Sequence, residues 1–203
     1  MNETRVLIVY DTNGGNTAAM AQRVARGVDG VPGCEAVLRA AEKVGPTSSA
    51  RTPEVPDQGA PYARASMLAD CDALILGTPT HFGNMSASLK HFLDGTTEQW
   101  FGGTLAGKPA GAFVSTGSPH GGQESTLLSM MLPLLHHGML ICGLPYTLPA
   151  LSKTSGGGTP YGPSHLAGSD GKRALDEDEA ALCTALGERV ARTAKALKEA
   201  GGA

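Results

Sequence analysis

The segment VLIVYDTNGGNT, residues 6–17, constrains the fold of this chain more than any other. Five apolar, mostly β-favouring residues precede a turn of Asn, Gly and Thr, and a helical pattern begins directly after that turn. The segment predicts a buried strand that passes through a tight loop into a helix N-terminus. Free backbone N–H groups at such a loop can bind a phosphate without a lysine, and no Lys or Arg lies between Asp11 and Gln22. The alternative is an ordinary first strand-to-helix turn of an α/β domain.

Length and charge limit the class of protein. The chain has 203 residues, enough for one α/β domain with a substantial core, and we expect a single domain over residues 1–203. Charged residues make up 17% of the sequence and the net charge is −3, so electrostatics give no reason to expect nucleic-acid binding. The expected partners are therefore small molecules or protein surfaces.

The cysteines and the apolar runs bear on compartment. The four cysteines, Cys34, Cys71, Cys142 and Cys183, are widely separated and form no CxxC pair or metal-ligand cluster, so we expect reduced, packed thiols and no metal. The longest early apolar run, VLIVY, is too short for a signal-peptide core or a membrane span. We expect a cytoplasmic protein that does not associate with membranes.

Hydrophobic periodicity and capping signals predict the remaining elements. Apolar runs predict strands at residues 35–39, 73–76, 110–114 and 139–144. A first helix is predicted from the apolar stripe of Ala21, Val24, Ala25 and Val28 and should stop near residues 27–33. Further helices are predicted at 62–68, from an N-cap at Ser86 to Asp94, over 123–137, and from Asp176 with Glu179 in a capping-box pattern. Gly and Pro cluster at 27–33, 45–61, 102–122 and 143–171. We expect loops at 45–61 and 152–174 and a glycine-rich segment at 95–107.

Alternating strands and helices predict an α/β fold, a doubly wound five-stranded parallel sheet with helices on both faces and long loop insertions. Ligands bind such sheets at the carboxyl ends of the strands, where the strand order reverses. Three loops follow predicted strands and are rich in Gly and hydroxyl residues: Asp11 to Thr17, Thr78 to Asn84 and Ser115 to Gly122. The presence of three such loops favours a ligand site over an ordinary turn.

Several nucleotide-dependent classes do not fit these loops. A Walker loop ends in Gly-Lys-Ser/Thr, whereas this chain has Asn16 and Thr17 without a lysine. A two-component receiver needs an Asp after its third strand, where this chain has Thr78 and Pro79. The adjacent Gly14 and Gly15 break the G-x-G-x-x-G spacing of a dinucleotide site. What remains is a monophosphate held by hydroxyl and backbone groups, with a flat ring system along the other two loops.

Longer motifs resemble a known family. The sequence TNGGNT at Thr12 to Thr17 resembles the FMN phosphate loop of flavodoxins, with Gly14 in place of a usual hydroxyl residue. GTPTHFGNM, STGSPHGGQE, HHGM and SGGGTPYGPSHLAGSDG resemble successive signatures of the WrbA family of flavodoxin-like NAD(P)H:quinone oxidoreductases. The resemblance spans about residues 5 to 200. It implies a flavodoxin-like fold, bound FMN, two-electron transfer from NAD(P)H to a quinone, and a homotetramer with sites at subunit contacts.

The resemblance also implies roles for individual residues. The FMN phosphate would be held by Asp11, Thr12, Asn13, Gly14, Gly15, Asn16 and Thr17. The isoalloxazine would lie along Thr78, Pro79, Thr80, His81, Phe82 and Gly83. Donors to the ring and the ribityl chain would come from Ser115, Thr116, Gly117, Ser118, Pro119 and His120. His136 would lie near the flavin, and Trp100 would cover the substrate pocket from a neighbouring subunit. His81, His136 and Trp100 are the expected catalytic residues.

Some of these residues have a structural alternative or depart from the family. A lone tryptophan is usually a core anchor, and a histidine at a helix end often complements the helix dipole, which applies to Trp100 and His136. The family usually has Tyr at the position of Asn13 and Arg at the position of His81. Asp11 places a carboxylate beside the expected phosphate, which is repulsive unless the side chain points away.

Two other functions remain open beside the oxidoreductase. A flavodoxin-type one-electron carrier usually sandwiches the ring between aromatics and surrounds it with acidic residues. Ser115 to Gly122 contains neither, and Thr78 to Asn84 contains no carboxylate, which favours a two-electron enzyme that reacts with NAD(P)H and then with quinone. A non-catalytic FMN-binding interaction protein is the third possibility, and no exposed basic or amphipathic segment supports it.

Overall fold

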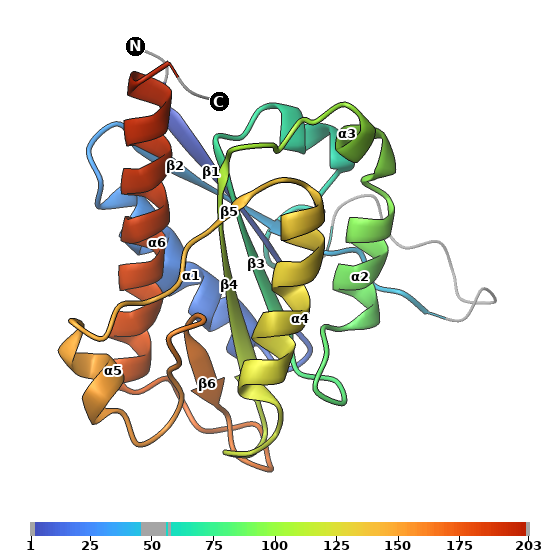
Figure 1. Ribbon diagram of the computed structural model, residues 1–203. Helices are drawn as coiled ribbons and strands as arrows, with labels where there is room; N and C mark the ends of the chain where they lie inside the picture. Colours follow the sequence, from blue (N-terminus) through green and yellow to red (C-terminus); the bar gives the residue numbers. More distant parts are fainter. Residues whose placement is uncertain (1–2, 46–55, 57, 202–203) are drawn as a thin grey trace.

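The fold is a parallel β-sheet between two layers of helices (Figure 1). The computed structural model describes residues 3–45, 56 and 58–201. Five strands pair in the order β2-β1-β3-β4-β5, and a sixth pairs with β4. The strands are β1 (Thr4–Tyr10), β2 (Cys34–Ala40), β3 (Ala73–Pro79), β4 (Pro109–Thr116), β5 (Leu140–Ile141) and β6 (Ser164–Leu166). The strand order reverses beside β1, so the predicted doubly wound sheet is confirmed.

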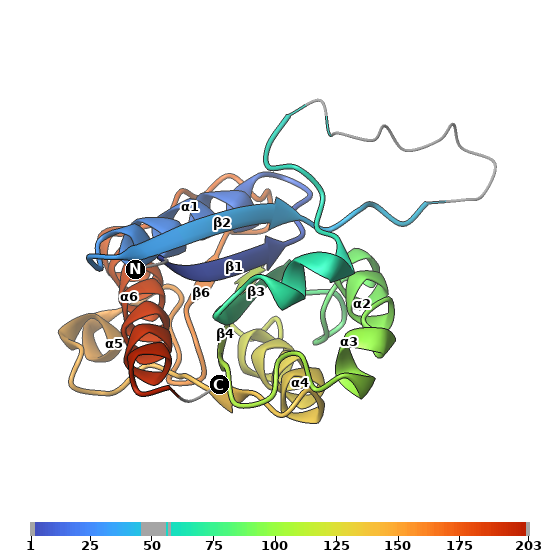
Figure 2. The ribbon, with the colours of Figure 1, turned by 90° about the horizontal axis from the view of Figure 1, so that it is seen from above.

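The helices divide between the two faces of the sheet, as the view from above shows (Figure 2). Helices α1 (Asn16–Asp29) and α6 (Glu177–Glu199) cover one face. Helices α2 (Ala87–Asp94) and α4 (Gln123–His136) cover the other, with the 3₁₀ helix Ala65–Ala69 and the short helix α3 (Thr97–Phe101) on the same side. Helix α5 (Pro149–Lys153) lies beside α6. Of the helices described, none is long and apolar enough to cross a membrane.

Strand β1 is buried on both faces, which explains its nearly continuous apolar sequence. Val6, Ile8 and Tyr10 pack into the layer formed with α1 and α6. Leu7 and Val9 point the other way, into the layer formed with α2 and α4. The first strand therefore joins both hydrophobic layers and fixes the position of the loop that follows it.

The fifth position of the sheet differs from the prediction. The strand predicted at 139–144 is only two residues long, and β5 pairs with Pro109 and Ala110 at the start of β4. Strand β6, which lies inside the loop predicted at 152–174, pairs with Val114 to Thr116 at the end of β4. Since β3 occupies the other side of β4, the two short strands lie in series along one side. The sequence SHL of β6 is too short and too polar to be recognised as a strand.

Several other elements also differ from the prediction. The helix predicted at 62–68 is the 3₁₀ turn Ala65–Ala69, and the glycine-rich segment 95–107 contains α3. The loop predicted at 45–61 lies mostly outside the described residues. The N-cap at Ser86 and the capping box of Asp176 with Glu179 are confirmed. Short-range capping chemistry was thus easier to predict than short helices fixed by tertiary packing.

Two glycines bring α1 and α6 into close contact. A Cβ atom on Gly27 would lie 2.0 Å from the carbonyl oxygen of Thr184, and one on Gly187 would lie 2.0 Å from the carbonyl oxygen of Val24. Each helix therefore presents a glycine to the backbone of the other. This packing holds both helices close to the sheet face below β1.

We predict that Gly187→Ala destabilises the protein by about 1–3 kcal/mol although alanine has the higher helix propensity, because the methyl group would force α6 away from α1. Urea unfolding followed by circular dichroism measures the change. Gly14→Ala is the matched control, since nothing lies within 4 Å of a Cβ atom at Gly14 and stability should stay nearly unchanged. Equal stability of both variants and the wild type would contradict this account of the helix contact.

Candidate functional site

The three predicted loops meet at the carboxyl edge of the sheet. The backbone N–H of Thr80 donates to the Ser115 carbonyl at 2.9 Å. A Cβ atom on Gly122 would lie 2.8 Å from the Cα atom of Gly83, so the second and third loops touch. Asn13 Nδ2 lies 3.5 Å from Nε2 of His81 and links the first loop to the second. The structure thus brings the segments 11–17, 78–84 and 115–122 together.

The first loop forms an open cradle of backbone groups. Gly15 has a φ of 89° at the N-cap of α1, and its N–H donates to Oγ1 of Thr12 at 3.1 Å. Cβ atoms on Gly14 or Gly15 would meet nothing within 4 Å, so space is free directly above the loop. The first turn of α1 leaves N–H groups without intrahelical acceptors. The arrangement suits a phosphate, and Thr12 and the buried Thr17 add hydroxyl groups.

Asp11 is the buried first residue of this loop and is paired with a lysine that the sequence motifs did not indicate. Its side chain is 3% exposed, and Oδ1 accepts a hydrogen bond from Nζ of Lys43. Lys43 follows β2 and lies 32 positions along the chain from Asp11. The end of β2 lies beside the end of β1 in the sheet. This strand order was the one available indication that Lys43 and Asp11 would be close together.

A fourth segment, residues 167–171, closes the site beside the first and third loops. The Asn16 side-chain amide donates to the Gly171 carbonyl at 2.8 Å. The backbone N–H of Ala167 donates to the Thr116 carbonyl at 2.8 Å. This segment lies in the loop predicted at 152–174, and its contact with the phosphate loop was not predicted from the sequence.

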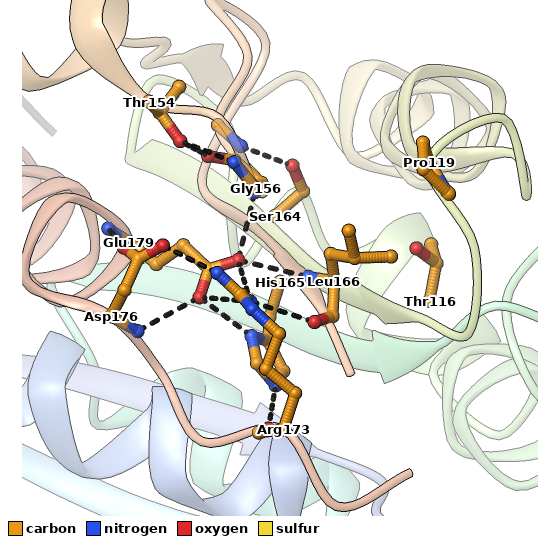
Figure 3. A network of polar contacts seen from close by, with 12 residues as sticks. Thr116, Pro119, Thr154, Gly156, Ser164, His165, Leu166, Arg173, Asp176 and Glu179 are labelled. Atoms are coloured by element: carbon orange, nitrogen blue, oxygen red, sulfur yellow. Dashed lines mark hydrogen bonds and ion pairs between the residues drawn. The ribbon is translucent and has the colours of Figure 1, made fainter. Parts of the chain in front are cut away.

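Four ionisable side chains anchor this fourth segment to α6 (Figure 3). The carboxylate of Glu179 is fully buried and accepts a hydrogen bond at 2.9 Å on each oxygen from Nη1 of Arg173, and one at 2.9 Å from Nδ1 of His165. It also accepts backbone N–H groups of Gly157 and Leu166. Nη2 of Arg173 also forms an ion pair with Oδ2 of Asp176, the N-cap residue of α6. The network therefore ties His165 and Leu166 of β6, and Gly157 before it, to the first turn of α6.

The network sets the acidity of Glu179. Burial alone would raise the pKa of its carboxyl group, but the hydrogen bonds from His165, Leu166, Arg173 and Asp176 outweigh burial and lower the pKa to about 2. The buried carboxylate is therefore ionised at neutral pH and surrounded by donors. The same charge contributes to the raised pKa of the buried Cys183 thiol, after the larger effect of burial.

The second and third loops present different groups to the solvent. Phe82 has a φ of 53°, which is unusual for a residue with a side chain, and its ring is fully exposed. His81 and the segment Gly117 to His120 are also exposed. Thr78 is instead buried, and its hydroxyl accepts the Ser86 N–H and donates to the Pro79 carbonyl. Its side chain therefore supports the loop, whereas Phe82 and His81 face outward.

Trp100 and His136 lie away from the three loops of the same chain. Helix α4 begins at the third loop, and its 14 residues span about 20 Å before His136. The Trp100 indole N–H donates to the His136 carbonyl at 2.8 Å, and its ring is 4.6 Å from the exposed Phe101 ring. The structure brings Trp100 and His136 to each other at the far end of α4. Within the described residues, no three His, Cys, Asp or Glu side chains gather as a metal site.

We predict that stability above pH 5 includes about 3 kcal/mol from the lowered pKa of Glu179. Because the folded-state pKa lies below the ordinary value, this contribution is present above about pH 5 and is lost as pH falls towards 2. Urea unfolding of the wild type and Glu179→Gln across this range measures it. Glu179→Gln should be less stable at pH 7, and its free energy of unfolding should fall less steeply than that of the wild type between pH 5 and 2.

Glu177→Gln, in the same helical turn but exposed, serves as the control and should keep the wild-type pH dependence. The same loss of stability with falling pH in the wild type and Glu179→Gln would show that other carboxylates cause the acid destabilisation.

Comparison with known proteins places this site in a family context. The model of the family described as NADPH-dependent FMN reductase matches residues 4–147. A curated relative from Solidesulfovibrio magneticus, named NAD(P)H dehydrogenase (quinone), is 42% identical over 200 residues, which cover 95% of this chain and 98% of the relative. The similarity therefore extends over nearly the whole chain.

Solved structures agree on the fold. A WrbA-like flavodoxin from Agrobacterium tumefaciens superposes with a TM-score of 0.65 at 24% identity, covering 96% of this chain and 99% of that one. A flavodoxin from the domain Archaea gives a TM-score of 0.63 at 18% identity, covering 95% and 99%. The expected flavodoxin-like fold is thereby confirmed. With the family match over most of its length and the close relative, the chain belongs to the NADPH-dependent FMN reductase family.

Proposed function

We propose that this protein is an FMN-dependent NAD(P)H:quinone oxidoreductase. The observation that carries the proposal is the meeting of three Gly- and hydroxyl-rich loops at the switch point of the sheet, with free space above Gly14 and Gly15. The family match and the name of the 42% identical relative support the same activity. When bound, FMN supplies the two-electron redox chemistry, and the protein supplies binding and orientation.

The residues present fit FMN. The first loop, Asp11 to Thr17, would hold the phosphate through its N–H groups and the hydroxyls of Thr12 and Thr17. Backbone groups of Pro79 to Gly83 would line the isoalloxazine, and Ser115 to His120 would offer donors to the ring and the ribityl chain. Residues 167–171 would close the phosphate end, since Gly171 holds the Asn16 side chain.

The substrates would reach the ring beside His81 and Phe82. Both side chains are exposed, and the left-handed backbone at Phe82 holds an aromatic ring in solvent, where burial gives it no stability. An aromatic ring held in this way suits stacking against a nicotinamide or a quinone. The segment Ser115 to Gly122 contributes no aromatic ring or carboxylate, which favours the enzyme over a one-electron carrier.

We further propose a homotetramer in which Trp100 and His136 complete the site of a neighbouring subunit. Their distance from the loops of the same chain supports this arrangement. Helix α4 also exposes a row of leucines, Leu128, Leu132 and Leu135, and Leu132 is 62% exposed. Such a row on one helix face is typical of a protein interface.

The remaining expectations concern location and domain organisation. We propose that the chain acts in the cytoplasm, which the four free thiols support. We also propose that residues 1–203 form one FMN-binding domain, which the continuous pairing of all six strands supports. The substrates would be NAD(P)H and a quinone, without nucleic acid or membrane.

We predict that the FMN-loaded protein oxidises NADH or NADPH only when benzoquinone is present, with parallel double-reciprocal lines. The reason is that both substrates would use one open ring face in turn. The decrease in absorbance at 340 nm measures the rate of NAD(P)H oxidation, and protein without FMN is the control. Stoichiometric FMN binding without turnover for either nucleotide would contradict the proposed activity and favour a binding protein.

We predict that Leu132→Glu lowers the oligomeric state, because a carboxylate in an apolar interface loses hydration without gaining a partner. Size-exclusion chromatography with light scattering measures the mass. Arg192→Glu, an exposed charge change on α6 across the sheet, is the control and should leave the mass unchanged. A monomeric wild type would contradict the tetramer and the shared site.

A further inference from the structure

The charge of Asp11 conflicts with the proposed phosphate site. Asp11 is the first residue after β1, and its backbone N–H is bound to the Gly77 carbonyl, so the residue cannot move far from the loop. Its side chain is 3% exposed and lies next to the residues that would hold the phosphate. A carboxylate and a phosphate dianion repel strongly in a partly desolvated site unless a cation lies nearby. The loop itself contains no Lys or Arg.

Lys43 brings the missing cation from the loop after β2. Its Nζ donates to Oδ1 of Asp11 at 2.5 Å, to the carbonyl oxygen of Thr12 at 2.7 Å and to Oδ1 of Asn13 at 2.9 Å. A lysine ammonium has three N–H donors, so these contacts use all of them. The charge therefore has a fixed position against the first three residues of the loop.

These contacts also orient the loop backbone. In a trans peptide the C=O and the following N–H point in opposite directions. Since the Thr12 carbonyl points towards Nζ of Lys43, the N–H of Asn13 points away from it. Lys43 thus occupies the oxygen acceptors of Asp11, Thr12 and Asn13, and the backbone N–H of Asn13 stays directed away from the lysine. An ion pair with Asp11 alone would not need the contacts with Thr12 and Asn13.

We propose that Lys43 is the cationic member of the phosphate-binding site, a positioning residue that cancels the charge of Asp11 and holds the start of the loop in the conformation that accepts the phosphate of FMN. This inference rests on the proposed function. The loop sequence contains no cationic residue, and Lys43, from outside the loop, supplies one. Its ligand is the phosphate monoester end of the cofactor, not the ring.

A thermodynamic cycle on the apoprotein tests this role, with FMN and riboflavin as probes and flavin fluorescence quenching as the readout. Lys43→Met should weaken FMN binding by about tenfold or more, because Asp11 then faces the phosphate uncompensated. Riboflavin, which lacks the phosphate, should bind within about twofold of the wild type. Lys43→Met with Asp11→Asn should recover only part of the FMN affinity, since both charges are gone but the contacts of Lys43 with Thr12 and Asn13 stay lost.

Lys90→Met is the matched control, because Lys90 is exposed on α2 and pairs with Asp94 at 2.6 Å. It should leave both affinities unchanged. Equal losses for FMN and riboflavin in Lys43→Met, or no recovery in the double variant, would overturn the proposal. Thermal unfolding of each variant, measured without flavin, separates loss of folding from loss of binding, and the double variant tests the charge balance if Lys43→Met alone is unstable.

The same titration separates the two proposals. If the wild type fails to bind FMN, the proposed function itself is wrong. If the wild type binds FMN and Lys43→Met binds it equally well, only the role of Lys43 is wrong.

Discussion

The pairing of β1 with β3 on one side and β2 on the other is the constraint on which the site depends. All three strands run in the same direction, so their carboxyl ends and the loops that follow them lie at one edge. The burial of β1 in both hydrophobic layers makes this arrangement rigid. The same pairing places the residues after β2, including Lys43, beside the loop after β1. The sheet thus assembles the site from segments that are far apart in the chain.

A second constraint acts on the glycine-rich part of the chain. Residues 154–176 contain few apolar side chains that could hold them in place, and the buried carboxylate of Glu179 fulfils this function through hydrogen bonds. Burying an ionised group is costly unless donors surround it, and here Arg173 and His165 supply them. Packing therefore fixes the sheet, whereas a polar network fixes the segment that reaches Asn16 and Thr116.

Much of the fold could be predicted because its signals are local. The apolar run of β1, the Ser86 cap and the capping box of Asp176 each need only neighbouring residues to be recognised. The three loops were predicted because each follows an apolar strand. Lys43, β6 and the contact of Gly171 with Asn16 were missed because each depends on residues brought together from distant positions. The contact of the Trp100 indole with the His136 carbonyl was missed for the same reason, since the two residues lie 36 positions apart.

The division of the fifth sheet position between β5 and β6 has a consequence for access to the site. Strand β6 pairs only with the last residues of β4, whereas β1, β2 and β3 are paired independently of it. Opening of residues 164–171 alone would break their contacts with β4 and leave the pairing of β1, β2 and β3 intact. The Leu166 amide is bound to Glu179 and the Ala167 amide to the Thr116 carbonyl, so both bonds would have to break in such an opening. The opening would expose the phosphate end of the proposed FMN site without global unfolding.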